Sequence, residues 1–212
     1  MNRTSFLVDG FNVYHSAKAA STDLGGRSTK WLNLRSLLCS FLPVIGAGAT
    51  LERIYYFSAL ASHLDAHRTG VTARHRLYLE CLQATDVIPV LGRFKYKTVH
   101  CRTCNRDNPH YEEKETDVAI SVKLNEILLK DEADTVVLVT GDTDLAPAVR
   151  TAAVLFPSKQ ICFAFPYKRK NKELAQLVSK HFQIRKERYL AHQFSDPVVL
   201  PSGKRLSKPT GW

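Results

Sequence analysis

Four aspartates, spread over three short segments of the chain, could together hold a divalent metal ion. Asp9 follows the first apolar run, Asp117 opens a helical pattern, and Asp142 and Asp144 follow the most apolar run of the sequence. Clustered carboxylates repel one another, and a divalent cation removes that cost. Mg²⁺ and Mn²⁺ prefer such oxygen ligands, and an ion held there can bind a phosphate oxygen and activate a water. A phosphodiester is therefore the substrate that this set of residues favours.

Each aspartate also has an ordinary structural explanation. Asp9 could be a turn residue, Asp117 a helix-cap residue, and Asp142 or Asp144 an N-cap. Taken together these explanations are weaker, because separate elements would then carry Asp at one edge of the fold by chance. For Asp144 the structural explanation is strongest, since an Asp two residues after Asp142 is also well placed to cap the next helix.

Short apolar runs alternate with longer helical patterns along most of the chain. Strands are expected at 5–8, 52–58, 85–90, 135–139, 160–165 and 182–185. Helices are expected at 31–42, 63–82, 116–130, 143–155 and 171–180. The segment 92–99 either extends the strand before it or forms one arm of a hairpin. This alternation predicts an α/β fold with a mainly parallel sheet covered on both faces, and ligands bind such sheets beyond the carboxyl ends of the strands.

The length and composition of the chain suit one domain with a tail. Its 212 residues, of which 44% are hydrophobic, suffice to bury a core. We expect this domain to span residues 1–192 and a flexible basic tail to span 193–212, where the apolar pattern stops. No signal peptide is recognisable, and no apolar stretch approaches the roughly 20 residues that cross a bilayer. The five cysteines are an odd number, which argues against a disulfide framework, so we expect a soluble cytoplasmic protein without a membrane partner.

The positive charge is concentrated in the last quarter of the chain. Residues 159–212 contain 12 Lys and Arg against 3 Asp and Glu, whereas residues 1–158 contain 18 against 17. A local basic excess is typical of a protein that binds a polyanion, nucleic acid above all. The strongest candidates for phosphate contacts and base stacking are Tyr167, Lys168, Arg169, Lys170 and Lys172. Arg93, Lys95 and Lys97, which alternate along an extended segment, form a second and weaker candidate.

The pair formed by Cys101 and Cys104 is a candidate zinc-binding motif. His110 follows it as a third ligand, and the fourth is open, with His100 as a candidate. A structural zinc site takes four ligands, commonly from two such pairs. A free reducible pair of thiols and a vestigial zinc knuckle are therefore the alternatives to bound Zn²⁺.

Three segments of the chain together resemble the motifs of the NYN domain family. They are Phe6–Tyr14, Lys114–Val118 and Thr140–Leu145. This family includes the LabA-like proteins and belongs to the PIN-like nuclease group. The resemblance runs from Thr4 to Arg185 in motif order and spacing. It implies a Rossmann-like three-layer α/β/α fold and a ribonuclease site that uses Mg²⁺ or Mn²⁺.

The resemblance also implies which residues form the catalytic site: Asp9, Asn12, Asp117, Asp142 and Asp144. The four aspartates correspond to acidic metal ligands, and Asn12 corresponds to the polar residue that orients the first carboxylate or a water. No protein nucleophile is assigned. Thr143 and Leu145 stand where the family commonly has Ser and an aromatic residue, and neither difference removes a ligand.

Two other functions remain to be weighed against an RNA nuclease. Haloacid-dehalogenase phosphatases share an Asp after the first strand but need a second Asp two residues later, where this chain has Phe11. A non-catalytic RNA-binding or protein-interaction module with the same fold is the main alternative, although a binder of phosphates gains nothing from four clustered acids. DNA is open as a substrate, because no residue is expected to read a 2′-hydroxyl, and a homo-oligomer is open as well.

Overall fold

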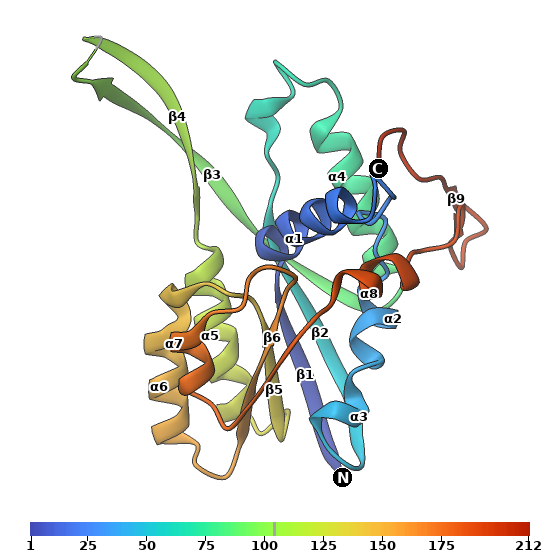
Figure 1. Ribbon diagram of the computed structural model, residues 1–212, viewed down its shortest axis with the longest axis vertical. Helices are drawn as coiled ribbons and strands as arrows, with labels where there is room; N and C mark the ends of the chain where they lie inside the picture. The colour runs from blue at the N-terminus through green and yellow to red at the C-terminus, as the bar shows by residue number, and fades with distance from the viewer. Residues whose placement is uncertain (104) are drawn as a thin grey trace.

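A central sheet of seven strands organises the chain in a computed structural model that describes residues 1–103 and 105–212. The strands are ordered β4-β3-β2-β1-β5-β6-β7, and all neighbours are parallel except β3 and β4 (Figure 1). Their bounds are β1 Asn2–Asp9, β2 Ala49–Ala59, β3 Val87–Cys101, β4 Arg106–Lys114, β5 Thr135–Val139, β6 Gln160–Phe165 and β7 Lys180–Gln183. The mainly parallel α/β fold expected from the sequence is confirmed.

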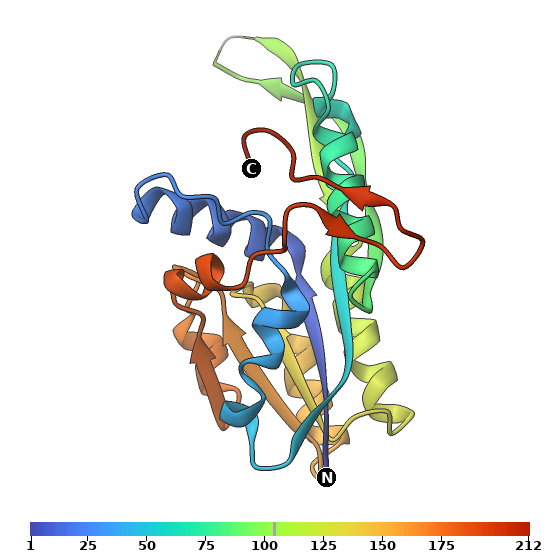
Figure 2. The ribbon, with the colours of Figure 1, turned by 90° about the vertical axis from the view of Figure 1, so that its right-hand side faces the viewer.

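Helices cover both faces of the sheet (Figure 2). One layer contains α1 Gly10–Asp23, α2 Leu34–Cys39, α3 Leu42–Ile45, α4 Val71–Gln83 and α8 Lys186–Ala191. The other layer contains α5 Thr116–Leu129, α6 Ala146–Leu155 and α7 Lys172–Gln176. Short 3₁₀ turns lie at Ser62–Leu64 and Thr143–Leu145. Within the described ranges, no helix combines the length and the apolar character needed to cross a membrane.

The two central strands bring the acidic segments together. Strand β1 is buried on both faces, with Phe6 and Val8 in one core cluster and Leu7 in the other. A strand buried on both faces reads as a continuous apolar run, which is why it was visible in the sequence. Its neighbour β5 is also fully buried, and Val8 pairs with Val139 at the carboxyl ends of the two strands. The chain segments that follow β1 and β5 therefore leave the sheet side by side.

Helix α1 is absent from the sequence prediction, and α4 is shorter than predicted. The buried side of α1 consists of small residues with Val13, including Ser16, Ala17 and Ala20, so its apolar periodicity is weak. The helix expected at 63–82 begins only at Val71, because Gly70 before it has a φ of 78°. A left-handed residue at that point cannot continue a helix from the preceding turn.

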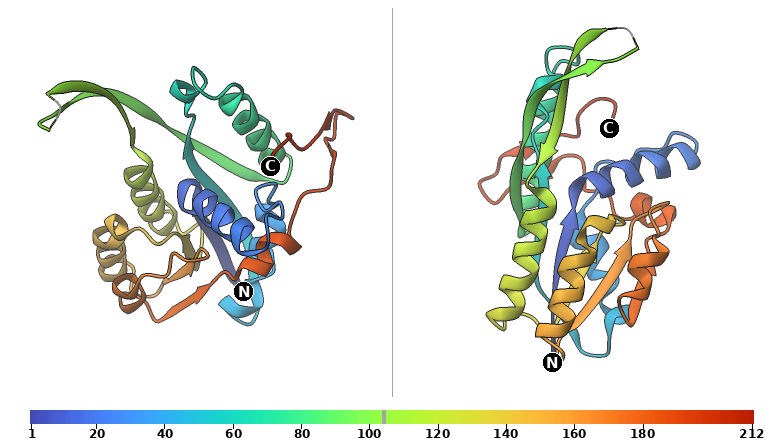
Figure 3. Two further views of the ribbon diagram at one scale, coloured as in Figure 1. Left: turned by 45° about the horizontal axis from the view of Figure 1, so that its top comes forward. Right: turned by 90° about the vertical axis from the view of Figure 1, so that its left-hand side faces the viewer.

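Strand β3 continues far beyond its pairing with β2. Its contact with β2 ends at Gly92, and from Arg93 onward it pairs only with β4. Both alternatives left open for 92–99 are therefore realised, since the strand is extended and forms a hairpin. The resulting two-stranded ribbon projects from the domain (Figures 1 and 3).

The segment 193–212, expected to be a flexible tail, packs against the domain instead. Phe194, Val198 and Leu206 are buried in the core cluster on the α1 side of the sheet. Trp212 contacts the ring of Trp31 at 5.9 Å between centroids. These apolar residues fall in short stretches between polar residues, prolines and glycines, so no periodic pattern revealed their burial.

Candidate metal centre

Asp9 is held at the junction between β1 and α1. Its side chain is only 3% exposed, and its Oδ1 accepts a hydrogen bond from the backbone N–H of Asn12 at 2.9 Å, which caps α1. The next residue must be glycine, because a Cβ at Gly10 would lie 2.6 Å from the carbonyl oxygen of Phe57 and 2.7 Å from the ring of Tyr56. This close approach places the start of α1 directly against β2.

Two polar side chains donate to the second oxygen of Asp9. The Asn12 side-chain amide and the Thr140 hydroxyl both donate to Oδ2, the latter at 2.8 Å. Thr140 also accepts a hydrogen bond from the backbone N–H of Asp142 at 3.1 Å. Asn12 Oδ1 accepts from the N–H of Gly141 at 3.3 Å. These bonds tie the segment after β1 to the segment after β5.

Three of the four aspartates expected at the site converge. Asp9, Asp117 and Asp142 each offer a carboxylate oxygen, and these atoms all lie within 4.8 Å of one another. Asp117 reaches this point from the first turn of α5, and Asp142 from the N-cap of the 3₁₀ turn that precedes α6. Asp142 also accepts a hydrogen bond from the N–H of Asp144 at 3.1 Å. It is therefore an N-cap as well as a candidate metal ligand.

Asp144 lies at the margin of this group rather than within it. Its side chain is exposed, and it is not one of the three residues whose oxygens converge. Its charge still contributes to the site as the smallest of four acidic influences that raise the pKa of Asp117. Its expected role as a ligand stays a prediction.

The acids at this edge of the sheet are held in an unfavourable electrostatic environment. Partial burial and the negative charges of Asp142 and Asp9 raise the pKa of Asp117 to about 6. Burial also raises the pKa of Asp9, although its three hydrogen bonds act in the opposite direction. Among the described residues, no Lys, Arg or His forms an ion pair with Asp9, Asp117 or Asp142. A divalent cation with a preference for oxygen ligands fits this donor set, because it would relieve the repulsion that the chain itself leaves in place.

Glu113 is a nearby acid that the sequence did not reveal. It lies in β4, accepts a hydrogen bond from the Thr116 hydroxyl, and raises the pKa of Asp117 more than Asp144 does. Its position depends on the register of the β3–β4 hairpin, and spacing along the chain gives no sign of it.

The basic turn at 167–172 lies beside the loop after β5 that carries Asp142. Some of its residues contact α1, and others face solvent. Tyr167 and Lys168 face Asp23 at the end of α1, which accepts a hydrogen bond from the Tyr167 hydroxyl at 2.8 Å and pairs with Lys168 Nζ at 2.5 Å. Tyr167 therefore anchors the turn, and its expected stacking on a base stays a prediction. A Cβ at Gly141 would lie 2.1 Å from the carbonyl oxygen of Arg169, so the backbones of the two loops touch.

Three other cations of the turn face solvent. Arg169, Lys170 and Lys172 are exposed. Arg169 also lies close enough to α1 to lower the pKa of His15, second to burial among the causes. The structure thus brings the backbone of the basic turn against the segment that carries Asp142, and the role of its cations in binding nucleic acid stays a prediction.

The candidate zinc residues are spread along the β3–β4 hairpin. Cys101 is opposite Arg106, while His110 is opposite Lys97, four residues further along the ribbon. Four strand residues span roughly 13 Å, so His110 does not lie beside Cys101 in this arrangement. His100 Nδ1 is 2.9 Å from Asp107 Oδ1. Cys104 lies outside the described residues, and zinc binding stays a prediction.

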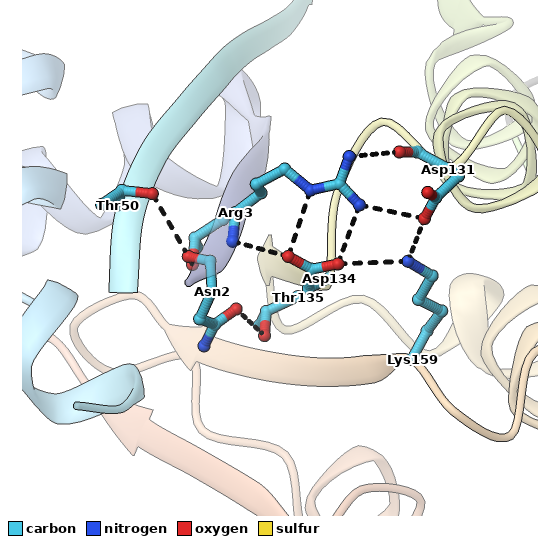
Figure 4. Close-up of polar contacts among 8 residues, drawn as sticks. Asn2, Arg3, Thr50, Asp131, Asp134, Thr135 and Lys159 are labelled. Carbon is cyan, nitrogen blue, oxygen red and sulfur yellow. Dashed lines mark hydrogen bonds and ion pairs between the residues drawn. The ribbon is translucent and has the colours of Figure 1, made fainter. Parts of the chain in front are cut away.

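A second group of acids occupies the opposite edge of the sheet (Figure 4). The guanidinium of Arg3 donates to both carboxylate oxygens of Asp134, at 2.8 and 3.1 Å, and pairs with Asp131 at 3.0 Å. Lys159 forms ion pairs with the same two aspartates. Hydrogen bonds from these cations lower the pKa of both acids, led by Lys159 for Asp131 and by Arg3 for Asp134.

A mainly parallel sheet with three aspartates that converge beyond its carboxyl edge defines an α/β domain with a candidate metal site. The family model of the NYN domain matches residues 3–184, so the chain belongs to the NYN domain family. The family expected from the three motifs is confirmed.

Two similar proteins add to this result. The chain is 25% identical over 242 residues to "6-hydroxy-3-succinoylpyridine 3-monooxygenase HspA" of Pseudomonas putida (strain DSM 28022 / S16), a match that covers 99% of this chain and 75% of that protein. A crystal structure of a protein of unknown function from Vibrio parahaemolyticus RIMD 2210633 superposes with a TM-score of 0.57 at 19% identity. That superposition covers 87% of this chain and 93% of the other, and it supports the fold alone.

Proposed function

We propose that the chain is a metal-dependent nuclease that hydrolyses phosphodiester bonds of RNA at the carboxyl edge of the sheet. The observation that carries this proposal is the convergence of Asp9, Asp117 and Asp142 within 4.8 Å, with no cation of the described chain paired to them. Membership of a nuclease-like family supports the same function. Binding alone would not need this arrangement, because three clustered carboxylates repel phosphate unless a metal ion lies between them.

Asp9, Asp117 and Asp142 would hold a Mg²⁺ or Mn²⁺ ion, with Asp144 in support. When bound, the ion supplies a Lewis acid that polarises a phosphate oxygen and lowers the pKa of a water. Asn12 and Thr140 act on Asp9 through its Oδ2, where their hydrogen bonds hold one carboxylate orientation. Partners of this kind typically change metal affinity or activity by about 10- to 100-fold.

The cations beside the acids explain how a polyanion would approach the site. Arg169, Lys170 and Lys172 are exposed on the turn whose backbone touches Gly141. Their charge would attract the phosphates that flank the scissile bond and would make the affinity for RNA depend on salt. DNA is an alternative polyanion, and a comparison of RNA with DNA of the same sequence distinguishes the two substrates.

The proposal is tested by incubating the purified chain with fluorescently labelled single-stranded RNA and Mn²⁺. We expect cleavage that EDTA abolishes and that the Asp142→Asn variant loses by a factor of at least about 100. Asp142 is chosen because it is less buried than Asp9 and its replacement by Asn keeps an N-cap. Equal cleavage by the variant, or no cleavage by the folded wild type, would favour the non-catalytic RNA-binding module instead.

The name of the relative from Pseudomonas putida suggests a second candidate, hydroxylation of 6-hydroxy-3-succinoylpyridine. Its basis is a match over 99% of this chain at 25% identity. Oxygen consumption in the presence of that compound and a reduced nicotinamide or flavin cofactor would reveal this activity. Oxygen uptake without any RNA cleavage would replace the nuclease proposal, whereas cleavage without oxygen uptake would uphold it.

A further inference from the structure

The β3–β4 hairpin forms a long ribbon whose two faces differ in chemistry. From Arg93 to Cys101 the strand β3 pairs only with β4, and residues directly opposite each other share a face. Tyr96 lies opposite Tyr111, so one face is aromatic. The other face carries Arg93, Lys95 and Lys97. We refer to the ribbon formed by residues 93–103 and 105–114 as the arm.

Five rings make an unbroken series of contacts from the body of the domain onto the arm. Phe11 meets Phe94 edge to face at 6.0 Å, and Phe94 lies 4.7 Å from the ring of His63. His63 stacks on Tyr111 at 4.1 Å, with an angle of 8° between the planes. Tyr111 meets Tyr96 at 5.3 Å. The outer two rings are open to solvent, with Tyr96 54% and Tyr111 41% exposed.

The inner end of this series lies at the metal centre. Phe11 follows Asp9 by two residues in the sequence. On the arm, Phe94 is opposite Glu113, which accepts a hydrogen bond from Thr116, the residue before Asp117. A chain that passes over the acids therefore meets Phe11 and Phe94 first and the two exposed tyrosines next.

The charge of the arm suits a polyanion rather than a second copy of the same arm. Residues 93–114 contain six Lys and Arg against three Asp and Glu. Within the described part of the arm, Lys95, Arg102 and Arg106 form no ion pair, whereas Glu112 is paired with both Lys97 and Lys114. Two arms of equal positive charge would repel each other, and the same charge attracts phosphates.

We propose that the aromatic face of the arm is a stacking platform for unpaired bases of single-stranded RNA whose scissile phosphate lies at the acidic cluster. This inference rests on the proposed function and adds the form of the substrate to it. Bases stack on exposed aromatic rings without regard to sequence, and they can do so only where they are free of a partner strand. Lys95, Arg102 and Arg106, the cations that form no ion pair within the described part of the arm, supply the charge that attracts the RNA backbone to the ribbon.

The test measures RNA affinity in the Asp142→Asn background, where cleavage is blocked. Fluorescence anisotropy with labelled oligouridylate of about 12 nucleotides compares the parent with a Tyr96→Ala/Tyr111→Ala pair, and the Kd should rise about tenfold or more. The matched control is the Tyr96→Phe/Tyr111→Phe pair, which keeps both rings and should bind as the parent does. Because Tyr111 packs on His63, the single Tyr96→Ala variant repeats the test at the most exposed ring, and it should weaken binding by about fivefold or more.

The other outcomes distinguish a failure of the stacking proposal from a failure of the nuclease proposal. If the Ala pair binds as tightly as the Phe pair, or if the parent binds no single-stranded RNA, the arm is not a platform. If sedimentation shows that the Ala pair disrupts a dimer while RNA affinity is unchanged, a second copy occupies the face and the proposal is overturned. If the Ala pair loses affinity but the wild type never cleaves RNA, the platform stands and the nuclease proposal falls.

Discussion

The two edges of the same sheet carry acidic clusters that are built in opposite ways. At the amino edge, where β1, β5 and β6 begin, Asp131 and Asp134 share the cations Arg3 and Lys159. These cations lower the pKa of both acids. At the carboxyl edge, three carboxylates lie together and the pKa values of Asp9 and Asp117 are raised. The charges of the first cluster balance one another, whereas the three carboxylates of the second could hold a divalent cation.

This difference distinguishes acids that stabilise the fold from acids that could hold a metal ion. Neutralised acids tie β1, β5 and β6 together at their starts, which is a structural role. Crowded acids without a partner cost stability, and chains retain such features mainly at functional sites. Matched substitutions in the two clusters test this distinction. Equal responses at the two edges would show that the clusters do not differ.

The largest expected effect is on cleavage when an acid is neutralised at each edge in turn. Asp9→Asn should reduce RNA cleavage by a factor of at least about 100, because the metal loses a ligand that the fold positions. Asp134→Asn, the matched change at the amino edge, should leave cleavage unchanged. The rate of cleavage with Mn²⁺ checks both, with circular dichroism to show that the variants are folded. A similar loss in both variants would mean that the two clusters do not differ in function.

A smaller effect is expected from removing a hydroxyl that orients the first ligand. Thr140→Val deletes the donor to Asp9 Oδ2 and the acceptor for the Asp142 N–H, and activity should fall about 10-fold at limiting Mn²⁺. Thr143→Val in the same loop is the control, since the described contacts give that hydroxyl no hydrogen bond. Saturating Mn²⁺ should restore part of the loss. Equal losses of activity in the two variants would show that Thr140 supports the conformation of the loop and does not act through the Asp9 carboxylate.

Neutralising Asp117 should make the metal-free protein more stable at high pH. The folded pKa of about 6 lies above that of an unfolded aspartate, so ionisation lowers stability as the pH rises from about 4 to about 6. Asp117→Asn removes this penalty, which after solvent screening is about 1 kcal/mol, or roughly 2–4 °C in Tm at pH 8. Thermal unfolding in EDTA measures it, and the gain should vanish below about pH 4. A lower Tm for the variant at pH 8 would contradict the unfavourable electrostatics of this cluster.

The opposite sign is expected at the amino edge. The pKa of Asp134 is lowered, so its ion pairs contribute stability above the pKa of an unfolded aspartate, and this contribution is lost as the pH falls. Asp134→Asn should therefore lower Tm at pH 7 by roughly a few degrees, and less in high salt. The difference from wild type should shrink in acid. A Tm loss that persists at low pH would point to packing instead of charge.

Much of the fold could be predicted because its buried strands are continuous apolar runs. The strands at 135–139 and 160–165 have the bounds that the sequence suggested, and the sheet brings the ends of β1 and β5 together as expected. Helix α1 could not be predicted from periodicity, since it packs through alanines and a serine. The segment after Gln193 packs through apolar residues in short stretches that no periodic pattern marks.

The site shows the same division between local and long-range information. Asp9, Asn12, Asp117 and Asp142 lie in local motifs, and all four meet at the carboxyl edge. Glu113 and the aromatic series on the arm depend on strand register, which pairs residues far apart in the sequence. The use of Tyr167 as an anchor likewise depends on Asp23, 144 positions away.

The location of a bound ion tests the central claim most directly. Crystals soaked in Mn²⁺ and measured at a wavelength where manganese scatters anomalously should show one strong peak between Asp9, Asp117 and Asp142. The amino-edge cluster of Asp131 and Asp134, already paired with Arg3 and Lys159, should show none. A peak at the amino edge, or no peak among the three carboxylates, would contradict the account of the carboxyl edge as a metal centre.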